Sequence, residues 1–163
     1  GGNVATLWEG RVTQFGPTAQ DYRQPHNPTT ARVFSDPPMN FLKIEKRGAR
    51  IHFAEGQDLP AHGTLGRLAD GRYLAGFRPN HLDIDPMAGD VLQFPTRVAV
   101  TEITGSETFL HLDHAGERWV AVVSGVRGQA PGAEVTIWLN PAHAYVFDEK
   151  GGLVAAASYA EGN

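Results

Sequence analysis

The sequence predicts a mainly β protein, folded as a small barrel or sandwich, and three observations support this prediction. Hydrophobic residues make up 41% of the 163 residues, which is enough to bury a core. The 19 Gly and 11 Pro mark many turns. From Met39 onward, short apolar stretches are separated by turn residues about every eight to twelve positions, which is typical of all-β domains. A long helical bundle is therefore not expected.

The first elements are expected to form a β-hairpin. Residues 4–7 and 12–15 have the composition of two short strands, and Glu9 with Gly10 lies between them as a tight turn. If the sheet that the second strand would join lies outside this chain, the edge of that strand is unpaired. Because an unpaired strand edge favours pairing with another copy, we expect self-association, and deletion of residues 1–16 should favour a monomer in light scattering.

Two short helices and a domain boundary are predicted after the hairpin. Pro17 suits the first turn of one helix, and Asn27 followed by Pro28 supplies the N-cap and first position of the other, which should end near Phe34. The run Asp36-Pro37-Pro38 does not continue a helix, because proline lacks an N–H donor and restricts the residue before it.

We place the boundary between two domains at this run, giving domains of residues 1–36 and 37–163. The second domain is predicted to be all-β, with turns at Gly48, Gly116 and Gly151, where glycine permits positive φ. Its expected strands are residues 41–46, 49–53, 73–77, 92–103, 108–113, 119–123, 134–139 and 144–147.

The composition argues against several classes of function. Fourteen Lys and Arg against eighteen Asp and Glu give a net charge of −4, so no general attraction to nucleic acid or anionic lipid is expected. The absence of Cys excludes disulfides and a thiolate nucleophile, and a cytoplasmic location is the default expectation. No apolar run is as long as a membrane span, and the start at Gly1 without a Met indicates a cloning remnant or a cut inside a longer chain.

The lysines exclude a phosphate-cradling loop. Such a loop needs Gly-Lys-Ser or Gly-Lys-Thr after a glycine-rich turn. Lys43, Lys46 and Lys150 are the only lysines, and Ile, Arg and Gly follow them. The chain by itself is therefore not expected to bind and hydrolyse a nucleotide in this manner.

Other catalytic and metal-binding patterns are weak. His111, Asp113 and His114 lie close together, but in a strand His111 and Asp113 share one face while His114 points to the other. No known metal-ligand spacing is matched, and no Gly-x-Ser-x-Gly turn surrounds Ser106 or Ser124. We expect no catalytic, cofactor or metal site in this chain. A metal-dependent barrel enzyme using His111 and His114 is kept as a hypothesis for metal analysis to test.

Several blocks of the sequence recur, in order and in register, in one known family. Residues 10–16 read Gly-Arg-Val-Thr-Gln-Phe-Gly and residues 35–41 read Ser-Asp-Pro-Pro-Met-Asn-Phe. Residues 76–82 read Gly-Phe-Arg-Pro-Asn-His-Leu, and residues 102–108 read Glu-Ile-Thr-Gly-Ser-Glu-Thr. Together they resemble the C-terminal part of the ATP-binding subunits of ABC importers for sugars, polyols and glycerol phosphate, the maltose-importer type. Asn80 departs from the pattern, which has an acidic residue there.

The resemblance implies a fold and a separate role for each of the two predicted domains. Residues 1–36 would be the C-terminal remnant of the nucleotide-binding domain. Residues 37–163 would be the transport-associated (TOBE) domain, an OB-type, MOP-like small barrel with an accessory and regulatory role. The P-loop, the signature motif and the switch His would lie upstream of Gly1, with the ATP and Mg that they bind. The chain itself is therefore not expected to be an enzyme, although the full-length subunit is expected to be a transport ATPase.

The resemblance also implies partners. In such subunits, paired accessory domains meet in a homodimer and receive regulatory proteins or small effectors, and the whole subunit works with membrane subunits at the inner face of the cell membrane. The candidate contact residues are Phe41, Arg78, Pro79, Gly105 and Glu107. The Arg78 guanidinium is suited to hold a carboxylate or carbonyls, and Gly105 is expected in a turn where a side chain would obstruct.

A second hypothesis comes from a different class of function. Related OB-type domains of molybdate importers bind oxyanions, so the alternative is a small-ligand binding β-barrel. Arg78, Ser106 and Thr108 would be its donors. Calorimetric titration with molybdate, sulfate and sugar phosphates separates the two hypotheses, because the regulatory domain is expected to give no heat.

Overall fold

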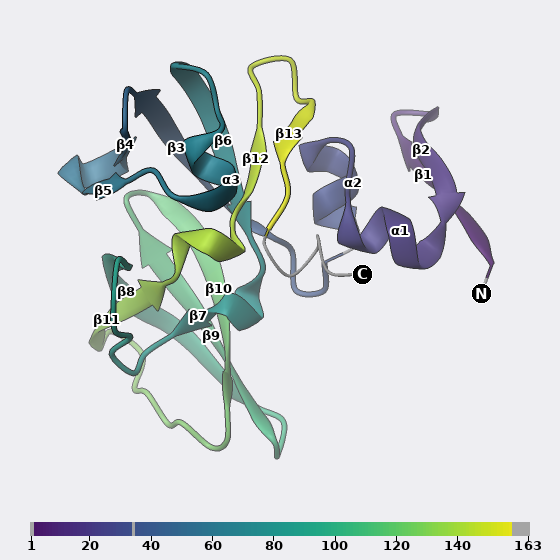
Figure 1. The fold of residues 1–163 in the computed structure, drawn as a ribbon. Coiled ribbons are helices and arrows are strands. Elements are labelled where there is room, and N and C mark those ends of the chain that lie inside the picture. The colour runs from purple at the N-terminus through teal and green to yellow at the C-terminus, as the bar shows by residue number, and fades with distance from the viewer. Residues whose placement is uncertain (1, 34, 158–163) are drawn as a thin grey trace. The chain divides into compact units, whose positions relative to one another are not determined.

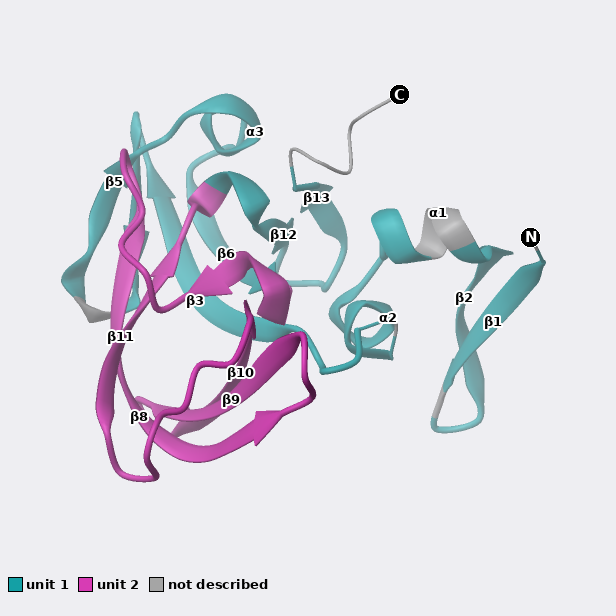
Figure 2. Cartoon of the chain, turned by 90° about the horizontal axis from the view of Figure 1, so that it is seen from below, with its two compact units in different colours: residues 1–77, 142–163 teal, residues 78–141 magenta. Residues whose placement is uncertain are grey.

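A computed structural model describes residues 2–33 and 35–157, and it separates the chain into two units (Figure 2). Unit 1 comprises residues 1–77 and 142–163, and unit 2 comprises residues 78–141. Unit 1 is thus made of two separate stretches of sequence, and unit 2 is the stretch between them. The predicted boundary between residues 36 and 37 falls inside unit 1 and remains a prediction.

Unit 1 begins with the expected hairpin and helices (Figure 1). Strand β1 (Asn3–Trp8) pairs antiparallel with β2 (Arg11–Pro17), and helices α1 (Thr18–Arg23) and α2 (Pro28–Val33) follow. The turn residues Glu9 and Gly10 have φ of 48° and 76°, the backbone conformation that tight hairpins favour. Pro17 ends β2 and does not open α1. The predicted helix end at Phe34 lies outside the described residues.

The start of α2 follows the predicted capping. The Oδ1 atom of Asn27 accepts a hydrogen bond from the Thr30 N–H at 2.8 Å, and its carbonyl accepts one from the Ala31 N–H at 3.0 Å. Pro28 occupies the first helical position, where its missing N–H costs nothing. The sequence signal for this helix start is therefore confirmed.

The two faces of the hairpin differ sharply in burial. Thr6 and Gln14 lie on the face toward the helices, where Gln14 Oε1 accepts a hydrogen bond from the His26 N–H at 2.8 Å. On the other face, Leu7, Val12 and Phe15 are 60%, 60% and 68% exposed. The hairpin therefore leaves an apolar face uncovered in this chain.

A six-stranded antiparallel sheet forms the rest of unit 1, with the order β13-β12-β6-β3-β4-β5. Alternation explains β3, where Leu42, Ile44 and Lys46 are buried and the residues between them face the other side. The strands are β3 (Asn40–Arg47), β4 (Arg50–Phe53), β5 (Asp58–Pro60), β6 (Gly71–Phe77), β12 (Tyr145–Phe147) and β13 (Leu153–Ala155). Helix α3 (Gly63–Gly66) and the 3₁₀ turn η1 (Ala54–Gly56) connect them.

Helix α2 covers part of one face of this sheet. Its buried residue Ala31 belongs to a cluster with Met39, Tyr145, Phe147 and Ala157. Phe41, Leu74, Leu153 and Ala156 pack against that cluster. The hairpin-and-helix segment is thus joined to the six-stranded sheet by apolar packing within unit 1.

Unit 2 is a five-stranded antiparallel sheet with the order β10-β9-β8-β11-β7. Its outermost strands β7 and β10 also contact each other, so the sheet nearly closes into a small barrel. The strands are β7 (Leu82–Asp83), β8 (Leu92–Ile103), β9 (Glu107–His114), β10 (Glu117–Ser124) and β11 (Glu134–Leu139), with 3₁₀ turns η2 (Pro79–His81) and η3 (Pro141–His143) at the ends. The predicted fold class, a mainly β chain with an OB-type small barrel after a hairpin and two short helices, is confirmed.

The barrel interior is filled by side chains from alternate positions of its strands. Phe94 and Trp119 meet edge to face, with ring centroids 5.0 Å apart. Leu110 and Leu112 of β9 and Ile137 of β11 are fully buried.

None of the helices in the described part of the chain is long and apolar enough to cross a membrane.

Candidate functional site

The five candidate contact residues fall in three places. Phe41 lies in β3 of unit 1, Arg78 and Pro79 open unit 2, and Gly105 and Glu107 lie where β8 turns into β9. Arg78 and Pro79 are adjacent in the chain, Gly105 and Glu107 belong to the same turn, and Phe41 belongs to unit 1.

Phe41 connects helix α2 to the sheet. The Cζ atom of Arg32 lies 4.7 Å from the centroid of the Phe41 ring, a distance that permits a cation–π interaction. On the other side, the ring centroid of Phe147 lies 6.3 Å away. Phe41 is half-buried by these contacts.

Arg78 and Pro79 directly follow β6, as predicted, and both are buried. The side chain of Arg78 is only 2% exposed, and Pro79 begins the 3₁₀ turn η2. Their burial means that they act on a partner only through the residues around them.

Gly105 and Glu107 are both exposed, and they shape the tip of the β8–β9 hairpin. The expectation that a side chain would obstruct at Gly105 is wrong, because a Cβ there would meet nothing within 4 Å. The requirement for glycine is the φ of 90°, which L-residues rarely adopt. A hydrogen bond of 2.9 Å from the Thr104 N–H to the Glu107 carbonyl closes the turn.

The three donors of the oxyanion hypothesis are not exposed together. Thr108 is fully buried, and its hydroxyl donates to the Gly125 carbonyl at 2.7 Å and accepts from the Arg127 N–H at 2.9 Å. Arg78 is buried and Ser106 is exposed. An oxyanion arriving from solvent would meet only the serine.

The histidines of β9 have separate environments. The Nε2 atom of His111 lies 2.8 Å from Glu102 Oε2, while His114 is buried with Nδ1 3.0 Å from the Pro95 carbonyl and its ring 4.3 Å from that of Trp119. Asp113 is exposed, so the predicted alternation of faces is right. Among residues 2–33 and 35–157, no group of three or more His, Asp or Glu side chains is placed to hold a metal ion.

The structure has a pocket that no local sequence pattern indicates. The sheet face opposite the buried side chains of β3 carries a pocket bordered by charged residues, among them Lys43, Glu45 and Arg72. The alternating charges at positions 43, 45 and 47 are a signal for a polar sheet face, although they do not reveal a pocket.

The comparisons with known proteins point to one family. The family model of the TOBE domain matches residues 75–147. An uncharacterised ABC transporter ATP-binding protein, y4oS, of Sinorhizobium fredii is 32% identical over 154 residues, which is 91% of this chain and 40% of that protein. The sn-glycerol-3-phosphate import ATP-binding protein UgpC of Jannaschia sp. is 30% identical over 145 residues, covering 89% of this chain and 40% of that protein.

The chain is also similar to a third curated relative and to a solved structure. The sulfoquinovosyl glycerol transport ATP-binding protein SmoE of Agrobacterium fabrum is 26% identical and covers 89% of this chain and 41% of that protein. The chain thus spans about two fifths of the length of these curated relatives. The structure of the cytoplasmic molybdate-binding protein ModG with molybdate bound matches with a TM-score of 0.48 and 18% identity, covering 66% of this chain and 94% of that one.

Proposed function

We propose that this chain, which carries a TOBE domain and is related over nine tenths of its length to ABC transporter ATP-binding proteins, is the C-terminal accessory and regulatory part of such a subunit in an ABC importer. The names of the relatives favour the sugar, polyol or glycerol-phosphate class of substrate. ATP and Mg are bound and ATP is hydrolysed in an upstream domain. The whole subunit works with membrane subunits at the inner face of the cell membrane.

The observation that carries this proposal is the extent of the similarity. It runs over 154 residues, more than the TOBE domain at residues 75–147, so it includes much of the hairpin-and-helix segment as well as the barrel. A free-standing barrel would need no such segment. We therefore assign residues 1–36 to the end of the nucleotide-binding domain and residues 37–163 to the accessory domain.

The uncovered face of the hairpin agrees with this assignment. Leu7, Val12 and Phe15 are large apolar side chains that are more than half exposed, and they share one face of a two-stranded sheet. Such a patch is expected to be covered by another part of a protein. In the full-length subunit that cover would be the rest of the nucleotide-binding domain, and without it a second copy of the chain would bind there.

The first experiment is to sequence the coding region upstream of the codon for Asn3. The proposal expects a P-loop, a signature motif and a switch His in the same reading frame. A start codon close upstream, with none of these motifs, would overturn the proposal and favour the hypothesis of a ligand-binding β-barrel.

Dimer contact is proposed at the tip of the β8–β9 hairpin, where Gly105 and Glu107 are exposed. In the full-length subunit, Glu107→Arg is expected to raise the dimer dissociation constant about tenfold, because a reversed charge at a contact removes electrostatic complementarity. Glu117→Arg is the matched control, since Glu117 is also exposed but lies at the β9–β10 turn. Sedimentation equilibrium that gives the same constant for both variants contradicts the proposed contact.

Regulation would act through the same surface. The proposal expects a regulatory protein or small effector to change the ATPase rate of the assembled transporter, and Glu107→Arg to reduce that response relative to Glu117→Arg. A basal rate and a response that are both unchanged would place regulation elsewhere on the subunit.

A further inference from the structure

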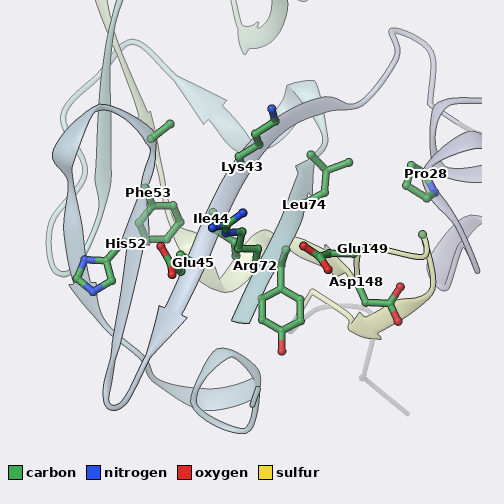
Figure 3. A pocket seen from close by; sticks show the side chains of 13 residues that line it. Pro28, Lys43, Ile44, Glu45, His52, Phe53, Arg72, Leu74, Asp148 and Glu149 are labelled. Carbon is green, nitrogen blue, oxygen red and sulfur yellow. The ribbon is translucent and has the colours of Figure 1, made fainter. Parts of the chain in front are cut away.

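The exposed face of the six-stranded sheet of unit 1 holds a pocket of about 690 Å³ (Figure 3). Strands β3, β4 and β6 contribute to it, together with Pro28 of α2 and the turn between β12 and β13. Pockets that bind small molecules have volumes of roughly 300–1,000 Å³. The size is therefore suited to a molecule of one or two sugar rings.

Charges of both signs border the pocket in nearly equal number. Lys43 and Arg72 reach it from neighbouring strands of the sheet, and Asp148 and Glu149 reach it from the turn (Figure 3). Glu45 also lines the pocket, but its carboxylate already accepts a hydrogen bond of 2.7 Å from Arg47 Nη2. The pocket therefore has no strong preference for an anion or for a cation.

Most of these charged groups keep hydrogen-bonding capacity. In the part of the chain that the structure describes, no hydrogen bond or ion pair joins Lys43, Arg72 or Glu149 to another side chain. Asp148 is held in place because its Oδ1 accepts bonds from the Lys150 and Gly152 N–H groups at 2.9 and 2.8 Å. The sheet side thus offers the donors of Lys43 and Arg72 together with the carboxylate of Glu45, which is paired with Arg72 across the strands, and the turn side offers acceptors only.

The floor between them is apolar. Leu74 is directly paired with Lys43 across the strands, and it is half-buried. Ile44 and Phe53 are buried beneath, and both line the pocket. A ligand here would place carbon atoms on Leu74 and polar groups toward both rims.

We propose that this pocket binds a small neutral polyhydroxylated molecule, a sugar or a polyol. A hydroxyl group both donates and accepts, so one ligand satisfies the cations on one rim and the carboxylates on the other. Hydrogen bonds to charged groups are also roughly twice as strong as those between neutral groups. An anion drawn to Lys43 and Arg72 would also lie near the carboxylates of the pocket, and a cation drawn to the carboxylates would lie near Lys43 and Arg72, so neither charge gains a clear advantage. The inference goes beyond the proposed function, because binding to this chain does not depend on the upstream domain.

Isothermal titration calorimetry of the 163-residue chain tests the proposal, with maltose, sorbitol, glycerol 3-phosphate and glycine betaine as probes. Binding of maltose or sorbitol, with no heat from the anion glycerol 3-phosphate or from the zwitterion glycine betaine, supports it. Lys43→Gln and Glu149→Gln should each weaken that binding at least fivefold, because each removes a charged hydrogen-bonding group. Lys150→Gln is the matched control, since this exposed lysine lies in the same turn but does not line the pocket.

Three results would overturn the site. They are the absence of heat with both neutral probes at millimolar concentration, binding that Lys43→Gln and Glu149→Gln leave unchanged, and a preference for glycerol 3-phosphate or glycine betaine. Circular dichroism of each variant confirms that the fold is intact. Each of these results leaves the importer-subunit role untouched, because that role is decided by the upstream reading frame.

Discussion

The guanidinium carbon of Arg32 lies 4.7 Å from the centroid of the Phe41 ring. Arg32 is in the last turn of α2 and Phe41 is in β3, so this contact joins the segment assigned to the nucleotide-binding domain to the segment assigned to the accessory domain. Both residues belong to unit 1. The two segments are therefore expected to be mechanically coupled, and a movement of α2 would reach the sheet through this pair.

The stabilising effect of this pair can be measured directly. We expect Arg32→Gln to lower the free energy of unfolding by about 0.5–1 kcal/mol, the usual strength of an exposed cation–π contact. Arg23→Gln, at the end of α1, is the control and should have less effect. In urea denaturation, a double-mutant cycle with Phe41→Leu should give a coupling energy of the same size. Additive effects of the two substitutions would show that the contact contributes nothing.

Gly76 is required by close packing. A Cβ there would lie 2.9 Å from both the Met39 sulfur and Phe41 Cε1, closer than such atoms approach. Gly76→Ala is therefore expected to destabilise the chain by about 1–3 kcal/mol through overpacking. Gly128→Ala is the matched control, because a Cβ at Gly128 meets nothing within 4 Å. Equal denaturation midpoints for the two variants would refute this account of Gly76.

The N-cap residue Asn27 is expected to stabilise helix α2. Asn27→Ala should cost about 1 kcal/mol, because the Thr30 N–H loses its acceptor. Asn27→Asp keeps an acceptor oxygen at the same place and should recover most of that loss. Thermal unfolding followed by circular dichroism measures both, and an alanine variant as stable as the parent would contradict the role of the cap.

His143 makes stability depend on pH. Burial lowers the pKa of His143 below its ordinary value of 6.5, so the folded state binds a proton less readily than the unfolded state. The contribution of this residue is thus fully present above the unfolded pKa and is lost as the pH falls through the folded pKa. We expect the free energy of unfolding to decrease between about pH 7.5 and about pH 5.5. His143→Gln should make this decrease smaller, and parallel curves for variant and parent would exclude the residue.

The sequence predicted the regular elements well because their signals are local. The long strands of the barrel alternate buried and exposed residues, and Asn27-Pro28 specifies a helix start through the side-chain oxygen of Asn27 and the missing N–H of Pro28. Strands β5, β7 and β13 were missed, since two or three residues are too few to show a period. Their existence depends on the neighbouring strand that they pair with.

The candidate site was harder to predict because it depends on distant contacts. The sequence indicated a strand end at Arg78 and a turn at Gly105, but the burial of Arg78 and the open space around Gly105 follow from tertiary packing. The pocket beside Lys43 brings together strands from the middle of the chain and a turn near its end. No local pattern records that Asp148 lies beside a sheet built from residues 40–77.

Because unit 1 is built from two separate stretches of sequence, its sheet is completed only late in synthesis of the chain. Strand β6 pairs with β12, and Gly76 is aligned with Tyr145. Strand β12 is synthesised only after residues 78–141, so β6 lacks this neighbouring strand until then. Until then, the β6 edge and the apolar positions later filled by Tyr145 and Phe147 are open on the nascent chain. A premature stop codon after unit 2 would therefore leave an intact barrel attached to an incomplete, aggregation-prone sheet.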